Sequence, residues 1–280
     1  MRTQFITPKE YEEAVYAIID STVAVGEKRP ERFLKVMKEN RGGIQAFFNP
    51  FGPTPDGLER KNPVIVALGD SVTAGHFEFL PDAKEKFERM LQGDFDENDY
   101  AEITDVRECY LEKFRSHLID HFEQTSVSTI NAGIAGDTMF GMQKRLYRDV
   151  IRYQADLVII NGSLNWSAEL GDVNVYENLL TEVVESVKAE TKSDIVLLTP
   201  NMDQPDDLRP DMPPSRLEER VEAIRRVAKK CDVCLADAYL IWKKFEAAGY
   251  PVKSLLANGH NHPSIVGHEI YARVLMQLIK

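Results

Sequence analysis

The chain has 280 residues, of which 43% are hydrophobic and 28% are charged, and its formal net charge is −11 at pH 7. The negative charge argues against nucleic acid or an anionic membrane as the main partner, because both are bound through basic surface. No apolar run approaches the roughly 20 residues of a membrane span, no secretory signal is visible, and three cysteines do not make a disulfide framework. We therefore expect a globular protein with a sizeable core, located in the cytoplasm.

Residues 1–61 are predicted to form a helical extension packed on the main body. Thr7-Pro8-Lys9-Glu10 is typical of a helix start, and residues 30–39 favour a second short helix. Residues 41–62 hold three Phe among glycines and prolines and predict a loop. The extension is compatible with a lid, a dimer contact or plain support.

The stretch 62–75, NPVIVALGDSVTAG, contains five apolar residues in a row, which predicts a strand buried on both faces. The strand ends at Gly69-Asp70-Ser71, so it delivers a serine to the edge of the sheet where open α/β proteins bind ligands. Taken alone, the same residues are equally typical of a helix cap. We expect Asp70 to hold this turn together by accepting backbone N–H bonds.

An acidic and aromatic insertion at about 77–105 follows, and then strands and helices alternate regularly to the C-terminus. This alternation predicts a parallel sheet with helices on both faces. The predicted strands are 64–68, 127–131, 157–161, 195–199 and 233–236, and the predicted helices are 106–122, 138–153, 174–191, 214–230 and 264–279.

The predicted strand ends carry the parts that an ester hydrolase needs. Ser71 is a weak nucleophile that must pass its proton to a base, and a histidine is suited to this near neutral pH. The backbone N–H groups of Ser71 and Gly136 and the side-chain amide of Asn165 are candidate donors to an oxyanion. A C-terminal loop, residues 258–263, supplies two histidines.

Four blocks in this order, GDSVTAG, NAGIAGDT, GSLN and NHPSIVGH, resemble those of the GDSL or SGNH hydrolase family from about residue 62 onward. The resemblance implies a flavodoxin-like, three-layer αβα sandwich, in agreement with the five predicted strands. It also implies that Ser71 is the nucleophile, that His262 is the general base, and that Gly136 and Asn165 are oxyanion donors.

The blocks depart from the family's pattern at two places. The family usually has an Asp three residues before the catalytic His, and this position is Gly259 here. The third triad member is therefore Asn258, a backbone carbonyl, or absent, which leaves a Ser71–His262 dyad. The family's Gly-x-Asn-Asp block is altered as well, since Trp166 follows Asn165.

Other histidines and cysteines have plainer interpretations. His260 is a rival base, and His268 is expected to be a packing or hydrogen-bonding residue. Cys231 and Cys234 have the Cys-x-x-Cys spacing, but residues three apart in a strand point to opposite faces. We therefore expect these two cysteines to be buried thiols. No metal or organic cofactor is expected.

We predict a serine esterase of the SGNH type that hydrolyses a small acyl ester, acetyl above all, with O-acetylated carbohydrates among the substrates. The alternative enzyme is a lipase or lysophospholipase, with an acyl-chain groove built from the Phe-rich segments 47–51 and 77–80. A catalytically inactive carbohydrate-binding relative is the alternative from another class. The expected partner is a small-molecule ester, and the sequence is also compatible with a homo-oligomer.

Overall fold

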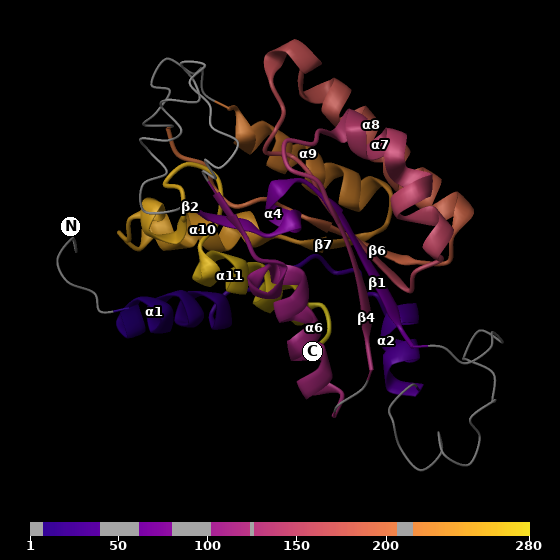
Figure 1. Ribbon diagram of the computed structural model, residues 1–280, viewed down its shortest axis with the longest axis horizontal. Helices are drawn as coiled ribbons and strands as arrows, with labels where there is room; N and C mark the ends of the chain where they lie inside the picture. The colour runs from indigo at the N-terminus through magenta and orange to yellow at the C-terminus, as the bar shows by residue number, and fades with distance from the viewer. Residues whose placement is uncertain (1–7, 40–61, 80–101, 124–125, 206–214) are drawn as a thin grey trace.

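In the computed structural model, which describes residues 8–39, 62–79, 102–123, 126–205 and 215–280, a five-stranded parallel sheet lies between two layers of helices (Figure 1). The strand order is β4-β1-β5-β6-β7, which is the flavodoxin-like order. The bounds are β1 (Val64–Gly69), β4 (Ser128–Gly133), β5 (Leu157–Asn161), β6 (Asp194–Leu198) and β7 (Cys234–Ala236). This confirms the predicted αβα sandwich and its five strands.

The two faces of the sheet are covered by different helices. Figure 1 shows α7, α8 and α9 on one side of the sheet and α6, α10 and α11 on the other. Their bounds are α6 (Tyr110–His121), α7 (Met139–Asp149), α8 (Val173–Glu190), α9 (Leu217–Lys230), α10 (Ala238–Ala247) and α11 (Ile265–Gln277). Short 3₁₀ helices are η1 (Val106–Glu108), η2 (Ile151–Tyr153), η3 (Ala168–Leu170) and η4 (Val252–Leu255).

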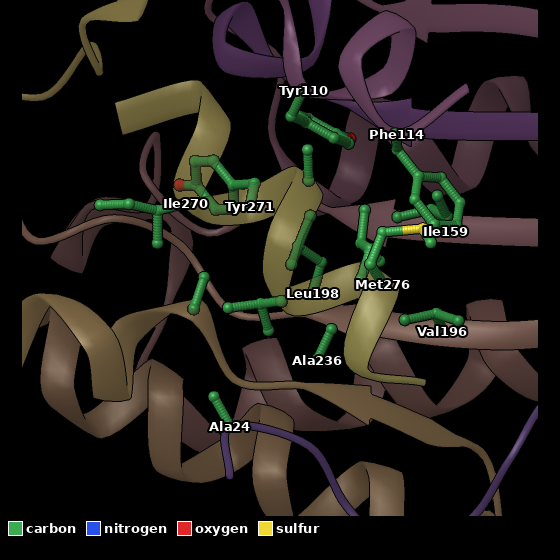
Figure 2. Close-up of a cluster of buried hydrophobic side chains, with 14 of the residues drawn as sticks. Ala24, Tyr110, Phe114, Ile159, Val196, Leu198, Ala236, Ile270, Tyr271 and Met276 are labelled. Atoms are coloured by element: carbon green, nitrogen blue, oxygen red, sulfur yellow. The ribbon is translucent and has the colours of Figure 1, made fainter. Parts of the chain in front are cut away.

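The central strands are apolar on both sides because each side packs into its own core. Within β1, Ile65 and Ala67 belong to one buried cluster, and Val66 and Leu68 belong to the other. This is the alternation that a strand imposes on its side chains. Figure 2 shows the first cluster, in which strand residues meet aromatic and aliphatic side chains of α6 and α11.

The prediction of one helix over 106–122 is wrong in detail. Cys109 is extended, with φ −73° and ψ 159°, and separates η1 from α6. Asp105 caps η1 through the backbone N–H of Arg107, so the first turn is closed locally and α6 starts afresh. The insertion also contains a small antiparallel sheet of β2 (His76–Phe79) and β3 (Glu102–Thr104), which the sequence did not predict.

Part of the N-terminal extension pairs with the edge of the sheet. Val25 forms an antiparallel bridge with Ala236 of β7, flanked by a bond from Gly26 N–H to the Leu235 carbonyl (3.0 Å). The segment therefore satisfies backbone groups of an edge strand that would otherwise be open to another chain. It connects α1 (Pro8–Asp20) and α2 (Glu31–Glu39).

Helix α2 is anchored at the amino-terminal edge of the sheet. The Asp194 carboxylate accepts a bond from the Phe33 N–H (2.8 Å), and Arg32 pairs with the fully buried Asp156 at 3.0 Å. Asp156 also accepts from the Val64 N–H at the start of β1 (2.9 Å). Helix α2 thus lies at the edge opposite the carboxyl ends of the strands.

The division into an extension of 1–61 and a hydrolase domain of 62–280 stays a prediction. The predicted loop at 41–62 lies almost wholly outside the described residues.

Candidate active site

Three neighbouring strands end at the same level. Gly69 of β1 is in register with Gly133 of β4 on one side and with Asn161 of β5 on the other. The segments that follow these residues, which hold Ser71, Gly136 and Asn165, therefore leave the sheet side by side. This convergence is what parallel strands in a common register produce.

The turn after β1 is built for close packing. Asp70 is the N-cap of α4 (Ser71–Ala74), and its Oδ1 accepts a bond from the Val72 N–H at 3.1 Å, as predicted. A Cβ on Gly69 would lie 2.0 Å from the Thr73 Oγ1 and 2.6 Å from a backbone oxygen, so only glycine fits there. Gly75, at φ 94°, ends the short helix in the left-handed region. Ser71 is therefore held as the first residue of a capped turn, 5% exposed.

The hydroxyl of Ser71 meets the C-terminal histidine loop. The Nε2 of His262 lies 2.9 Å from the Ser71 Oγ, although the two residues are 191 positions apart. The loop itself is closed by a bond from the Ala257 N–H to the His262 carbonyl (2.8 Å) and by a bridge between Leu256 and Pro263. The structure therefore brings together the predicted nucleophile and the predicted base.

Asn258 builds the turn that carries the histidine. Its Oδ1 accepts from the backbone N–H groups of His260, Asn261 and His262 at 2.9–3.0 Å, and its Nδ2 donates to the Asn261 Oδ1 (2.9 Å). Both ends of the amide are thus engaged with the loop rather than with the imidazole. Gly259 takes φ +70° in this turn, a conformation that an ordinary side chain adopts only at a cost.

Gly136 and Asn165 lie at neighbouring positions of the same edge. The Nδ2 of Asn165 donates to the backbone carbonyl of Asp137 at 3.1 Å, which leaves the second N–H of that amide available to a ligand. Gly136 is exposed, has φ +72°, and would have no atom within 4 Å of an added Cβ. Among the described residues, its backbone N–H has no acceptor.

Trp166, which stands where the family usually has Asp, is a packing residue. It is 7% exposed, its Nε1 donates to the Gly171 carbonyl (3.0 Å), and its ring stacks on Phe140 at 5.6 Å between centroids. The departure from the family's block therefore adds an aromatic contact beside Asn165.

Two buried ionisable groups stand next to the Ser71–His262 pair. Burial raises the pKa of Asp70 to about 6, and attraction to His262 acts in the opposite direction. Burial lowers the pKa of His268 to about 3, and repulsion from Lys113 and His262 adds to this effect. His268 is therefore neutral at neutral pH, with its Nδ1 accepting from the Tyr110 N–H at 3.2 Å, which agrees with its predicted packing role.

The other residues considered from the sequence take structural places. The Nδ1 of His260 lies 2.5 Å from the Gln204 carbonyl, so this ring faces the loop after β6. Cys109, Cys231 and Cys234 are free and buried, as expected for the last two. Within the described ranges, no three side chains of His, Cys, Asp or Glu are grouped to hold a metal ion.

Asn201 is a site residue whose role the sequence did not indicate. It is fully buried in the segment that follows β6, where its Nδ2 donates to the Asn261 carbonyl (2.9 Å) and its Oδ1 accepts from the Tyr271 hydroxyl (2.8 Å). It therefore ties the histidine loop to the sheet and to α11. Its position after a predicted strand was visible, but nothing in the sequence indicated its partners.

A profile of the GDSL-like lipase/acylhydrolase family matches residues 67–270. The chain belongs to this family. The predicted resemblance to GDSL or SGNH hydrolases is thus confirmed, and so is the prediction of a carboxylic ester hydrolase.

Individual members of the family share the fold at low identity. An acetylxylan esterase of Geobacillus stearothermophilus is 25% identical over 170 residues, which are 56% of this chain and 74% of that protein. The crystal structure of that organism's acetylxylan esterase superposes with a TM-score of 0.57 at 21% identity, over 78% of this chain and 94% of that one. A lipase/acylhydrolase from Enterococcus faecalis gives 0.57 at 23% identity, over 77% and 95%.

The helices of this GDSL-like protein flank a five-stranded parallel sheet. Among the described residues, none of them combines the length and the apolar character needed to cross a bilayer.

Proposed function

We propose that the protein is a serine esterase that hydrolyses small acyl esters, acetyl esters above all, through an acyl-enzyme on Ser71. The observation that carries the proposal is the 2.9 Å contact between the Ser71 Oγ and the His262 Nε2. This is the distance at which a neutral imidazole accepts the hydroxyl proton while the oxygen attacks a carbonyl.

The proposed reaction has two steps. In the first, the Ser71 oxygen bonds to the ester carbon, His262 takes the hydroxyl proton, and the collapse of the tetrahedral intermediate releases the alcohol with that proton. In the second, His262 takes a proton from water, the resulting hydroxide attacks the acyl group, and the acid leaves as Ser71 regains its proton. In both, the backbone N–H groups of Ser71 and Gly136 and the Asn165 amide receive the oxyanion.

We infer that the pair works as a dyad whose negative charge comes from Asp70. The side chain of Asn258 is occupied by three backbone N–H groups of its own loop, so we assign it to loop construction. The Asp70 carboxylate is fully buried next to Ser71 and is attracted to His262. Above its pKa it stabilises the imidazolium that forms as Ser71 attacks.

The substrate class is supported by the acetylxylan esterase relative. O-acetyl groups on a sugar or a related small alcohol fit an esterase of this family, and we propose them as substrates. The rival prediction of a long-chain lipase depends on Phe-rich segments 47–51 and 77–80, and the side chains of both lie outside the described residues.

The test combines acyl-chain preference with active-site variants. We expect p-nitrophenyl acetate to be hydrolysed faster than p-nitrophenyl octanoate, and acetate to be released from acetylated xylooligosaccharides. Ser71→Ala and His262→Gln are expected to lose about 10³-fold or more in kcat. His260→Gln, which alters the rival base in the same loop, is expected to lose less than about tenfold.

Three results would oppose the proposal in different ways. Equal hydrolysis by wild type and Ser71→Ala would refute the serine mechanism and favour the inactive binding protein. A preference for octanoate would favour the lipase. A larger loss in His260→Gln than in His262→Gln would move the base to the other histidine.

A further inference from the structure

One guanidinium group holds together the segments that carry Ser71 and the oxyanion donors. Arg145 of α7 is 8% exposed, and its Nη2 donates to the Gly69 carbonyl at 2.8 Å, at the end of β1. Its Nη1 donates to the Ala132 carbonyl of β4 at 2.6 Å. Its Nε donates to the Oδ2 of Asp137 at 2.7 Å, directly after Gly136.

The segment that presents Gly136 has few anchors of its own. It is a turn closed by a bond from the Asp137 N–H to the Ile134 carbonyl (3.1 Å), and Ile134 N–H donates back to the Gly69 carbonyl (3.1 Å). Gly136 is exposed and its φ of +72° is accessible to glycine at little cost. The turn is therefore held from outside.

Asp137 is the residue of this turn that Arg145 contacts. One of its carboxylate oxygens accepts from the Thr138 N–H (2.9 Å) and the other from Arg145, while its backbone carbonyl accepts from the Asn165 amide (3.1 Å). A shift of Asp137 would consequently move the Gly136 N–H and release the Asn165 side chain at the same time.

We propose that Arg145 is a positioning residue of the esterase, acting through Asp137 on the placement of the Gly136 and Asn165 donors. This inference rests on the proposed function, because it assigns the two groups to the oxyanion. Guanidinium is suited to the task, since its planar fork carries five N–H donors at fixed angles, whereas a lysine offers a single compact charge.

The same helix offers a matched control. Arg145 also pairs with Asp149 through Nη1 at 2.9 Å, and so does Arg148, whose Nε lies 2.6 Å from the same carboxylate. The Arg148 side chain is 62% exposed, and among the described residues it bonds to Asp149 and not to β1, β4 or the turn after β4. Arg148→Lys therefore changes the same kind of ion pair on α7 without touching the active-site edge.

The first measurement is steady-state hydrolysis of p-nitrophenyl acetate. Arg145→Lys is expected to lower kcat about 10–100-fold while KM changes less than about threefold, because the donors act on the transition state. Arg148→Lys is expected to keep kcat within about twofold of wild type. A kcat for Arg145→Lys within that same range would overturn the inference.

A double-mutant cycle separates positioning from a general structural role. If Arg145 acts through the donor placement, Arg145→Lys combined with Asn165→Ala loses less activity than the product of the two single losses. A fully multiplicative loss would overturn the inference, since it would show that Arg145 acts elsewhere. Urea unfolding of each variant ensures that only folded protein is compared.

Amide hydrogen exchange tests the placement without reference to activity. Exchange of residues 134–138 is expected to accelerate in Arg145→Lys and not in Arg148→Lys, while exchange of β5 stays unchanged. Unchanged exchange at 134–138 would overturn the inference. Absence of Ser71-dependent hydrolysis in the wild type would instead refute the proposed function, and the exchange result would still decide whether Arg145 anchors the turn.

Discussion

Replacement of the buried histidine of α11 is expected to change how the stability of the protein depends on pH. His268 is 0% exposed, and its pKa is lowered to about 3, chiefly because burial removes water from the charged form. In an unfolded chain the same imidazole has a pKa of about 6.5. The unfolded state therefore binds a proton at a pH where the native state does not.

The sign and size follow from this difference. The folded pKa is depressed, so the contribution of His268 to stability is fully present above pH ~6.5 and is lost progressively as the pH falls toward ~3. Each pH unit in this window costs about 1.36 kcal/mol. Between pH ~7 and pH ~5 the wild type is thus expected to lose about 2 kcal/mol of unfolding free energy through this group alone.

The assay is urea unfolding of wild type and His268→Asn across that range. The asparagine has no imidazole to titrate, and its side-chain oxygen can accept the Tyr110 N–H that Nδ1 accepts at 3.2 Å. The titrations of all other groups are common to both proteins, so they cancel when the free energy of unfolding of the variant is subtracted from that of wild type. This difference is expected to shrink by about 2 kcal/mol from pH ~7 to pH ~5. His121→Asn, at an exposed position, is the control for the replacement of a histidine by asparagine.

A constant difference between wild type and His268→Asn across this range would refute the reasoning. It would mean that the native state takes up the proton as readily as the unfolded chain does. The buried imidazole would then have an ordinary pKa, in spite of its complete burial.

Three further variants test the turn and the loop that hold the site. Asp70→Asn keeps a capping oxygen and removes a carboxylate whose pKa burial raises to about 6. At pH ~8 the buried charge of Asp70 destabilises the folded wild type, so the variant should be at least as stable as wild type in urea. Its kcat should fall about tenfold or more, because the negative charge next to His262 is lost. Gly69→Ala places a Cβ 2.0 Å from the Thr73 Oγ1 and should lower the free energy of unfolding in urea by about 3 kcal/mol or more. The control is Gly249→Ala, at φ +84° with open space around it, which should lower it by only about 1 kcal/mol. Asn258→Ala removes the acceptor of three backbone N–H groups and should lower kcat with little change in the pH dependence of kcat. A changed acidic limb of that pH profile would instead indicate that Asn258 is a partner of the imidazole.

Most of the sheet was predictable because its central strands, β1, β5 and β6, are short and mostly apolar runs. The ends differ by one or two residues, as between the predicted 127–131 and the observed Ser128–Gly133. Pairing of β2 with β3 was not predictable, since it joins two segments across more than twenty residues of insertion. Such non-local pairing leaves no period in either segment alone.

Helix α10 was missed although its signals are present. Asp237 caps it by accepting from the Leu240 N–H, and Ala238, Ile241, Trp242 and Phe245 lie buried at helical spacing. A search for a cap followed by apolar residues three and four apart would have found the helix.

The candidate site was predictable as a set of parts and not as a geometry. The order of the blocks pointed to Ser71 and His262, but the distance between them depends on how the last loop folds over the sheet. Asn258 shows the limit, because an asparagine side chain serves an imidazole or a backbone turn equally well by its chemistry. The partner of the Asn258 side chain is decided by which groups lie next to it, and their positions depend on the turn at Gly259.

In the proposed mechanism, the negative charge that supports the base comes from the side of the nucleophile. The family's pattern puts a carboxylate three residues before the histidine, where this chain has Gly259. Asp70 instead lies in the turn before Ser71, and its pKa of about 6 means that it carries full charge only above that pH. Protonation of Asp70 as the pH falls is therefore expected to contribute to the acidic limb of a kcat/KM profile. Asp70→Asn should therefore shift that limb as well as lower the plateau, and a lowered plateau with an unshifted limb would show that Asp70 acts only by shaping the turn.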